Sequence, residues 1–434
     1  MEIIDWRSFN GSLPDGWEAK LERPVTHILS LESTVSPILK EVREKGDEAV
    51  RRFTLMFDKV RLENLEVDDK EIQLADSLVP SELKKAIEMA RSNITDFHKS
   101  QLQTSEFVET MPGLRCWRRN SPIEKVGLYI PGGTAPLFST LLMLGIPASI
   151  AGCREIVVCS PPDTMGNLHP AILYTARLVG ATRVFRVGGV QAIAAMAYGT
   201  ETIPKLFKIF GPGNQYVMCA KQLVQKDGVA IDMPAGPSEL AVYADHTANP
   251  AFVAADLLSQ AEHGVDSQVI LVCSSDDMVD AVLLELNSQL NHIHRKQIAI
   301  RALENSKAIL MQDEQQAMNL INNYAPEHLI LACENAGELA LMVRNAGSVF
   351  LGHYSPESVG DYAAGTNHVL PTNGHARAYG GLSVDSFQKK ITFQELTNAG
   401  LKGIGPAVEL MAAAEGLQGH ALAVSIRLRG NASS

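Results

Sequence analysis

The stretch KVGLYIPGGTAPLFSTLLMLGIPASIAGCREIVVCS (125–160) contains two short apolar runs with a longer apolar segment between them. The runs KVGLYI (125–130) and EIVVCS (155–160) have the length and composition of buried strands, and residues 133–150 have the pattern of a helix. A strand, a helix and a second strand in this order form a βαβ unit, in which the two strands are parallel. The stretch therefore predicts an α/β fold.

The same alternation continues along the chain. The first block also contains strand-like runs at RVFRVG (183–188) and KLFKIFG (205–211) and helical patterns at 169–180, 190–199 and 214–225. A second block contains strand-like runs at 239–245, 267–274, 308–312 and 348–352 and helical patterns near 249–263, 276–290, 313–323 and 335–346. Two such blocks predict two mostly parallel sheets with helices on both faces, and a ligand cleft between two α/β halves.

The flanking regions have a different texture. Residues 1–120 are typical of helices, with apolar residues at three- and four-residue spacings between charges, and residues from about 390 to 434 form a mainly helical tail. We expect four parts: an N-terminal arm (1–25), a first α/β domain with a helical N-terminal part (26–125 with 238–382), a second, Rossmann-like domain (126–237) and a C-terminal helical tail (383–434).

Composition excludes several classes of protein. The 434 residues carry a net charge of −11 without a basic stripe, so a nucleic-acid partner is not expected. The longest apolar stretch, LLMLGIPASIAGC (141–153), is shorter than the ~20 residues of a membrane span. Residues 1–12 lack a basic leader with an apolar run, and the six cysteines contain no CxxC pattern. We expect a soluble, cytoplasmic protein without a membrane partner.

Two segments pair groups that are able to do chemistry. In DLLSQAEHG (256–264), Gln260 and His263 are three apart on an expected helix and could form half of a zinc site, or could simply be polar residues in a last turn. In YAPEHLIL (324–331), Pro326 suits a helix start, which places Glu327 and His328 near its positive end. These two side chains suit proton transfer, or serve only as a cap and a surface residue.

Two further segments are weaker candidates. Asp361, Asn367 and His368 lie in the polar, glycine-containing stretch SPESVGDYAAGTNHVLPT (355–372), which is either a site loop or a solvated one. Glu415 and His420 lie in the tail, where single polar residues are ordinary surface groups.

Glycine placement gives a weak indication of nucleotide binding. VGGVQA (187–192) and GPGN (211–214) each follow an expected strand and precede an expected helix, so a phosphate could approach the N–H groups of the helix. PGG (131–133) could serve the same purpose or be a plain turn. The GxGxxG fingerprint of dinucleotide folds is absent.

Taken together, these segments resemble the histidinol dehydrogenase family. The resemblance rests on motifs in one order and spacing from about residue 30 to the end: GLYIPGGTAPLFST (127–140), IFGPGN (209–214), IDMPAGPSE (231–239), DLLSQAEHG (256–264), PEHL (326–329) and GDYAAGTNHVLPT (360–372). It implies oxidation of L-histidinol to L-histidine with one zinc ion and two NAD, and two Rossmann-like domains with an incomplete dinucleotide fold. It also implies a homodimer in which the tail completes the active site of the partner.

The resemblance assigns roles residue by residue. It places the catalytic bases at Glu327 and His328, and the NAD contacts at Tyr129, Gln191 and Asn214. The implied zinc ligands are Gln260, His263, Asp361 and His420. The implied substrate contacts are Ser238, Gln260, His263, His328, Asp361, Glu415 and His420.

Three alternatives compete with this interpretation. Cys116 or Cys153 could attack an aldehyde as a thiol nucleophile, although Cys153 lies where small buried cysteines are common. A zinc hydrolase could use Glu327 as its base, and a non-catalytic protein could bind a nucleotide or a metal. Other histidines, such as His292 and His294, are expected at the surface.

Overall fold

The computed structural model describes residues 1–9, 13–24, 28–104, 106–132, 136–234 and 236–430. The expected boundary between residues 25 and 26, Gly133 of the PGG turn and residue 235 of the IDMPAGPSE motif lie outside the described residues. The chain divides into two compact units. The larger unit comprises Met1–Gln101 and Ile123–Phe387, and the smaller one comprises Leu102–Pro122 and Gln388–Ser434.

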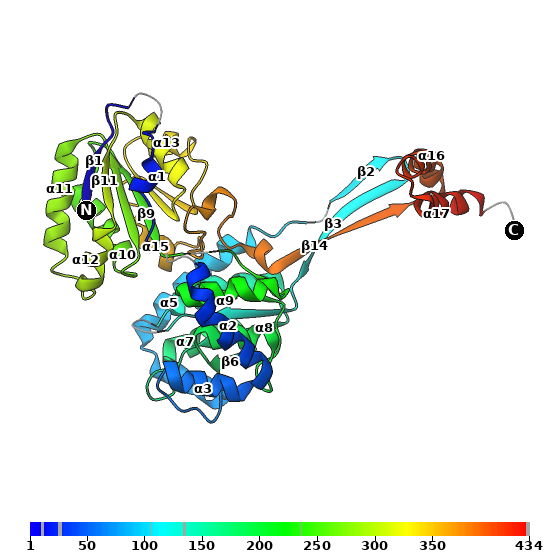
Figure 1. The fold of residues 1–434 in the computed structure, drawn as a ribbon, viewed down its shortest axis with the longest axis horizontal. Helices are drawn as coiled ribbons and strands as arrows, with labels where there is room; N and C mark the ends of the chain where they lie inside the picture. The colour runs from blue at the N-terminus through cyan, green and yellow to red at the C-terminus, as the bar shows by residue number, and fades with distance from the viewer. Residues whose placement is uncertain (10–12, 25–27, 105, 133–135, 235, 431–434) are drawn as a thin grey trace. The chain divides into compact units, whose positions relative to one another are not determined.

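The larger unit contains a six-stranded sheet in which every strand is parallel to its neighbours (Figure 1). Its order is β1-β11-β10-β9-β12-β13. The strands are β1 (Glu2–Asp5), β9 (Glu239–Ala244), β10 (Gln268–Cys273), β11 (Lys307–Leu310), β12 (His328–Ala332) and β13 (Ser348–Leu351). Helices α10 (Pro250–Ala261), α11 (Asp276–Gln289), α12 (Lys296–Glu304), α13 (Glu314–Tyr324) and α14 (Ala336–Ala340) alternate with them.

A five-stranded parallel sheet forms the other half of this unit, with the order β6-β5-β4-β7-β8. Its strands are β4 (Lys125–Tyr129), β5 (Glu155–Ser160), β6 (Arg183–Arg186), β7 (Lys208–Phe210) and β8 (Ala230–Ile231). Its helices are α6 (Phe138–Ala151), α7 (Pro170–Leu178), α8 (Gly189–Tyr198) and α9 (Gln215–Lys226). In the five-stranded sheet, and in the six-stranded sheet from β9 onward, the chain starts in the middle, runs to one edge and then crosses to the other side, as in Rossmann-like folds; β1 is added at the edge beside β11. The predicted pair of α/β sheets is confirmed.

The N-terminal helices cover the five-stranded sheet. Helix α2 (Ile28–Lys45) packs on α8 and α9, and α3 (Asp47–Phe57) packs on α8; α4 (Asp69–Leu78) packs on α7, and α5 (Ser81–Lys99) packs on α6. We expected residues 26–125 to form one domain with residues 238–382. In the structure, helices α2 to α5 pack instead on the helices of the five-stranded sheet. The reason is physical, because the apolar stripe of a helix shows that one face is buried but does not specify the sheet that buries it.

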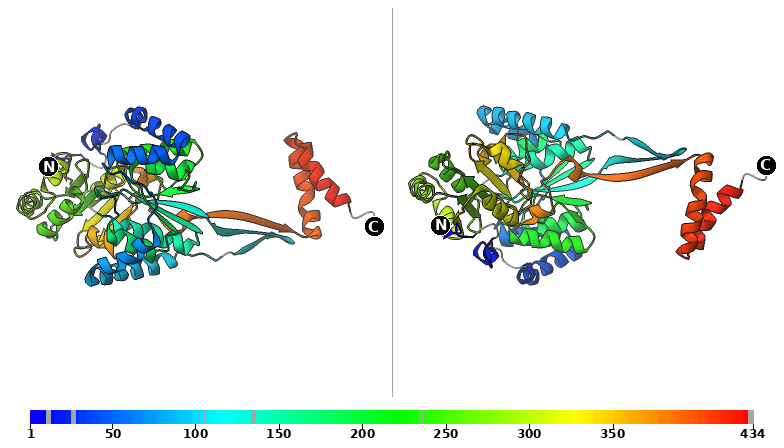
Figure 2. Two further views of the ribbon diagram at one scale, coloured as in Figure 1. Left: turned by 90° about the horizontal axis from the view of Figure 1, so that it is seen from below. Right: turned by 90° about the horizontal axis from the view of Figure 1, so that it is seen from above.

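The smaller unit combines an antiparallel sheet with two helices (Figure 2). Its strands β2 (Phe107–Met111), β3 (Leu114–Pro122) and β14 (Gln388–Leu396) pair in the order β14-β3-β2. The Trp117 ring stacks on Phe393 with the ring centroids 5.3 Å apart. Helices α16 (Asn398–Ala414) and α17 (Gln418–Arg429) follow β14. The helical tail is confirmed, but it begins with a strand.

Other segments also differ from the sequence-based expectation. The region 1–120 contains β1, β2 and most of β3 besides its helices; β1 and β2 are edge strands with mostly exposed residues, so they leave no apolar pattern in the sequence. The short elements are α1 (Trp17–Lys20), α15 (Glu357–Tyr362), and the 3₁₀ turns η1 (His375–Arg377) and η2 (Val384–Phe387). Among the described helices, none combines the length and apolar character that a membrane span requires.

Candidate active site

A cavity of about 390 Å³ lies within the larger unit. Its walls come from segments that follow β4 and β7 of the five-stranded sheet, where parallel sheets usually bind ligands, and from segments that precede β9, β10 and β12 of the six-stranded sheet. Its lining includes these residues singled out from the sequence: Asn214, Ser238, Gln260, His263, Glu327, His328, Asp361 and His368.

Glu327 and His328 lie at the start of a buried central strand. We expected them in the first turn of a helix, and that expectation is wrong: α13 ends at Tyr324, Ala325 adopts a left-handed conformation (φ 54°), and β12 begins at His328. The run HLILA is buried throughout between β9 and β13, so packing of its apolar side chains favours a strand. Both side chains are buried as a result.

The main chain of Glu239 contacts both side chains. Its N–H donates to Glu327 Oε2 (2.9 Å), and its carbonyl oxygen lies 3.3 Å from His328 Nδ1. Because a carbonyl oxygen only accepts hydrogen bonds, His328 Nδ1 must carry a proton in this contact. His328 Nε2 therefore faces the other way, 3.5 Å from Asp361 Oδ1, and neither of these atoms has a hydrogen-bonding partner among the described residues.

The electrostatics of this pair reflect burial and an excess of carboxylates. Burial raises the pKa of Glu327 to about 8. For His328, burial lowers the pKa, but the carboxylates of Glu357, Glu327 and Asp361 outweigh it and raise the pKa to about 10. A cation bound among these carboxylates would lower both pKa values and would leave His328 Nε2 able to accept a proton.

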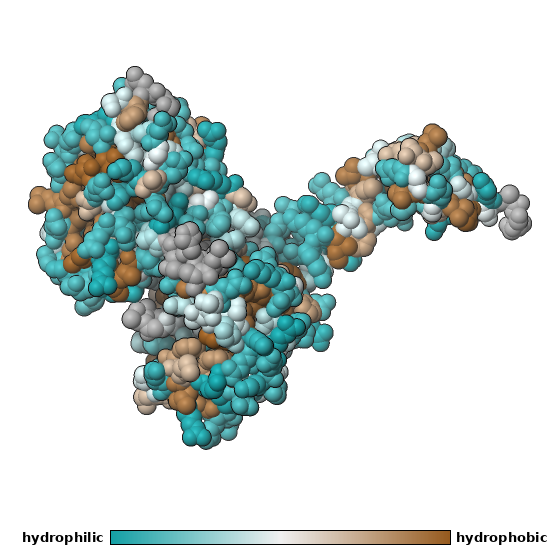
Figure 3. Space-filling view, in the orientation of Figure 1, coloured by the Kyte–Doolittle hydropathy of each residue, from teal (hydrophilic) through white to brown (hydrophobic). Residues whose placement is uncertain are grey.

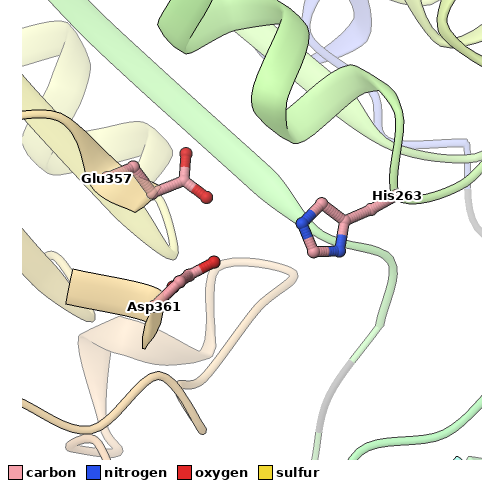
Figure 4. Close-up of side chains that lie close together, drawn as sticks. All are labelled: His263, Glu357 and Asp361. Atoms are coloured by element: carbon pink, nitrogen blue, oxygen red, sulfur yellow. The ribbon is translucent and has the colours of Figure 1, made fainter. Parts of the chain in front are cut away.

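Three side chains form a group that could hold such a cation. One potential ligand atom from each of His263, Glu357 and Asp361 lies within 4.8 Å of the others (Figure 4). Glu357 and Asp361 are four apart on α15, so their carboxylates lie on one face of that helix. A carboxylate–imidazole set of this kind suits zinc and other divalent cations.

Gln260 lies beside this group. It is buried in the last turn of α10, and α10 ends at Ala261, so His263 follows the helix rather than sharing its face as expected. In the amide orientation that satisfies its neighbours, Nε2 donates to Glu357 Oε1 and Oε1 accepts from the Glu239 N–H (3.0 Å). Gln260 thus contacts the same carboxylate and the same main-chain group as the rest of the site.

The residues expected to contact NAD lie at strand ends of the five-stranded sheet. Tyr129 ends β4, and its hydroxyl accepts from the N–H of Gly189 at the start of α8 (3.1 Å). Gln191 in the first turn of α8 is buried, and neither polar atom of its amide has a partner among the described residues. Asn214 caps α9 through its side-chain oxygen. Two helix N-termini and an unsatisfied amide suit a nucleotide phosphate.

Comparison with known proteins identifies the family. The family model described as histidinol dehydrogenase matches residues 21–428. The chain belongs to the histidinol dehydrogenase family. It is 60% identical over 412 residues to the histidinol dehydrogenase of Bacteroides thetaiotaomicron (95% of this chain, 96% of the relative), and 50% identical over 430 residues to that of Xanthomonas euvesicatoria pv. vesicatoria (99% of each).

The fold comparison agrees with the sequence comparison. The crystal structure of histidinol dehydrogenase from Elizabethkingia anophelis is similar to this chain with a TM-score of 0.95 and 52% sequence identity, covering 99% of this chain and 98% of that one. The resemblance inferred from the motifs is confirmed, and so is the fold class.

The family motif GDYAAGTNHVLPT folds into the wall of the cavity. His368 Nδ1 lies 2.7 Å from the Asp361 carbonyl oxygen, and its Nε2 lies 3.2 Å from Thr140 Oγ1. Asn367 donates to the Met143 carbonyl oxygen (2.6 Å). Asn367 and His368 therefore hold the segment that presents Asp361.

Glu415 and His420, to which the family pattern assigns roles, belong to the smaller unit. Glu415 follows the end of α16, and His420 is in the first turn of α17; both side chains are exposed. His292 and His294 are exposed, as expected.

Sequence reasoning missed Glu357, Glu239 and Arg23. Glu357 could have been found from its spacing, because it lies four residues before Asp361. Glu239 ends the motif IDMPAGPSE, but neither it nor its partner Arg23 gave a local signal of its contacts, because the residues that they contact are far away along the chain.

Proposed function

We propose that this protein oxidises L-histidinol to L-histidine through the aldehyde, using two NAD and a bound zinc ion in histidine biosynthesis. The observation that carries the proposal is the buried Glu327–His328 pair beside the His263–Glu357–Asp361 group in one cavity of a histidinol dehydrogenase family member.

The residues present fit a zinc ion. The Asp361 oxygen without a partner and its closeness to His263 are what a cation site requires. We propose Gln260, His263, Asp361 and His420 as the zinc ligands, with Ser238, His328 and Glu415 as further substrate contacts. When bound, zinc would supply Lewis-acid binding of the amine and imidazole nitrogens of histidinol.

The two bases take different protons. In the first oxidation, His328 Nε2 accepts the proton of the alcohol while the hydride of the same carbon passes to NAD, giving the aldehyde and NADH. In the second oxidation, Glu327 accepts a proton from a water molecule while the oxygen of that water attacks the aldehyde carbon. Protonated His328 returns its proton to the aldehyde oxygen, which completes the hydrate. The hydrate then loses a hydride to a second NAD and a hydroxyl proton to His328, giving the carboxylic acid, which releases its remaining proton to become the carboxylate.

The test is the yield of NADH per histidinol consumed by zinc-loaded protein. We expect two NADH and little aldehyde outside the protein. One NADH with aldehyde trapped in solution would contradict the second oxidation, and no NADH would refute the function. Chelation should abolish turnover and added zinc should restore it. Full turnover by protein that elemental analysis shows to lack metal would refute zinc dependence.

The alternatives are separable in the same assay. A hydrolase or a binding protein would form no NADH. For the thiol route, burial raises the pKa of Cys153 to about 12, which leaves little thiolate, and Cys116 lies on β3 of the smaller unit. We expect Cys116→Ala and Cys153→Ala to keep most activity. Loss of only the second oxidation in either folded variant would favour the thiol route.

We also propose a homodimer in which the tail of one subunit completes the active site of the other. Helices α16 and α17 expose apolar side chains, as the surface of the smaller unit in Figure 3 shows. The exposed residues are Leu410, Met411, Leu417, Leu422 and Ile426. An exposed apolar group of this size supports burial against a partner.

A further inference from the structure

Arg23 and Glu239 form an ion pair between the N-terminal segment and the start of β9. Arg23 Nε donates to Glu239 Oε1 (2.6 Å) and its terminal nitrogen donates to Oε2 (2.9 Å), which is the two-pronged geometry of a guanidinium on a carboxylate. The side chains are 15% and 2% exposed, so the pair is shielded from water. The Asn373 N–H also donates to Glu239 Oε1 (2.5 Å).

Arg23 holds a second segment of the site. Its guanidinium lies over the Tyr324 ring, 3.9 Å from the ring centroid, and donates to the Tyr324 carbonyl oxygen (2.8 Å). Tyr324 ends α13, three residues before Glu327. One side chain therefore contacts both the start of β9 and the connection that leads into β12.

The main chain of Glu239 connects the Arg23 ion pair to Glu327 and His328. Its N–H binds Glu327 Oε2 and its carbonyl oxygen faces His328 Nδ1, so its main chain determines where both functional groups point. A shift of Glu239 would release Glu327 and would weaken the contact that keeps the proton on His328 Nδ1.

We propose that Arg23 is a positioning residue for Glu327 and His328, acting through Glu239 and Tyr324. This inference rests on the proposed function, because it takes these two residues as the bases. The fork geometry and ring stacking are specific to Arg. Lys at position 23 keeps the charge, and with it the partner that the buried Glu239 needs, but loses the second hydrogen bond and the stacking.

The matched control is Arg183. It forms the same two-pronged pair with Glu66, with Nε 2.7 Å from Oε1 and a terminal nitrogen 2.5 Å from Oε2, at the edge strand β6. Neither residue lines the cavity. Arg23→Lys and Arg183→Lys therefore make the same chemical change, in a shielded pair that is connected to the proposed bases and in a half-exposed pair that is not, and thermal unfolding measures the difference in stability that burial brings.

The experiment compares kcat, KM and thermal unfolding of the zinc-loaded wild type and both variants. We expect Arg23→Lys to lower kcat about tenfold or more with the KM of histidinol within about twofold, because misplaced groups slow chemistry more than binding. Arg183→Lys should leave both constants unchanged. Glu239→Gln, which keeps an acceptor for Arg23, is a second variant and should lower kcat in the same way. Equal kcat in all folded variants would overturn the proposal.

A second measurement does not depend on turnover. The ¹⁵N resonance of His328 Nδ1 in histidine-labelled protein reports its contact with the Glu239 carbonyl oxygen, and its loss in His328→Asn assigns it. We expect this resonance to move in Arg23→Lys and not in Arg183→Lys. An unmoved resonance would overturn the positioning role. If the wild type forms no NADH from histidinol, the proposed function fails while this measurement still decides the role of Arg23.

Discussion

At the scale of single residues, two adjacent side chains in the cavity make different contacts. Glu327 and His328 are neighbours in sequence, yet Glu327 accepts a main-chain N–H while His328 turns Nε2 toward Asp361. Glu327 precedes β12 and His328 begins it, and His328 Nδ1 lies 3.6 Å from Glu327 Oε2, so the two side chains lie side by side in one cavity. Because Glu327 Oε2 faces the Glu239 N–H and His328 Nε2 faces Asp361, the two proposed bases would act on different protons.

We therefore expect the two bases to separate by reaction step. Glu327→Gln should slow oxidation of the aldehyde far more than oxidation of the alcohol, since only the second step needs an activated water. His328→Asn should slow both, and a lost acid–base group typically costs ~10²–10⁴ in rate. Rapid-mixing measurements of NADH from histidinol and from the aldehyde would resolve the steps. Equal, small effects of Glu327→Gln on both would contradict its role.

A carboxylate outside the site predicts pH-dependent stability. Asp58 follows the last residue of α3, where the helix dipole is negative; its Oδ2 is buried without a partner among the described residues, and burial raises its pKa to about 6. A raised carboxyl pKa favours folding at low pH, and that contribution is lost as pH rises through about 6. Asp58→Asn should then stabilise the protein at pH 7.5 by about 1–2 kcal/mol, after allowance for partial exposure.

The measurement is denaturant unfolding of wild type and Asp58→Asn at pH 4.5 and 7.5. The gain should shrink at the lower pH, where the wild-type carboxyl is protonated in the fold. A variant less stable than wild type at pH 7.5 would show that Asp58 makes a favourable interaction instead.

At the scale of elements, the connection from β7 to α9 is held by a buried ion pair. Lys221 on α9 contacts Asp232 Oδ1 (2.5 Å) and donates to the Gly211 carbonyl oxygen (2.8 Å), while the Gly211 N–H donates to Asp232 Oδ2 (2.8 Å). These contacts hold the GPGN turn (211–214), which ends at Asn214, against the end of β4. The turn lies where the order of the sheet reverses, which is the usual nucleotide position.

Gly211 and Gly228 provide a matched test of this turn. Both have positive φ (124° and 89°), but a Cβ at Gly211 would overlap the Tyr129 carbonyl oxygen, whereas a Cβ at Gly228 meets nothing within 4 Å. Gly228→Ala should cost only the conformational strain, about 1–2 kcal/mol. Gly211→Ala should cost more and should weaken NAD binding at least tenfold, because the strand ends must separate. Calorimetry would measure the loss of stability, and the KM for NAD would measure the change in binding. An unchanged KM in Gly211→Ala would show that NAD binding does not depend on this turn.

At the scale of the whole molecule, the proposed exchange of tails predicts complementation between defective subunits. Gln260→Ala and His420→Ala subunits should each be nearly inactive alone. If tails are exchanged, a mixed dimer has one site with both defects and one intact site. Half of the randomly reassembled dimers are mixed, so roughly a quarter of wild-type activity should return. If each site belonged to one chain, every site would keep one defect, and no activity would return although mass spectrometry showed subunit exchange.

The order of elements and the family were accessible from the sequence because their signals are local. Short apolar runs such as EIVVCS coincide with β5, since four or five buried residues between turns suffice to define a central strand. The motifs that pair Gln260 with His263 and Glu327 with His328 lie on contiguous segments, so one stretch of chain carries each pair.

The packing partners of these segments are visible in the three-dimensional fold alone. HLILA forms a strand rather than a helix because β9 and β13 flank it. The helices between residues 28 and 99 pack on the helices of the five-stranded sheet. Glu357, which lies on α15, contacts Gln260. The Arg23–Glu239 pair joins positions 216 residues apart. Periodicity and propensity encode which face of an element is buried, whereas its partner is selected by packing and hydrogen bonding across the whole fold, and no local pattern contains that information.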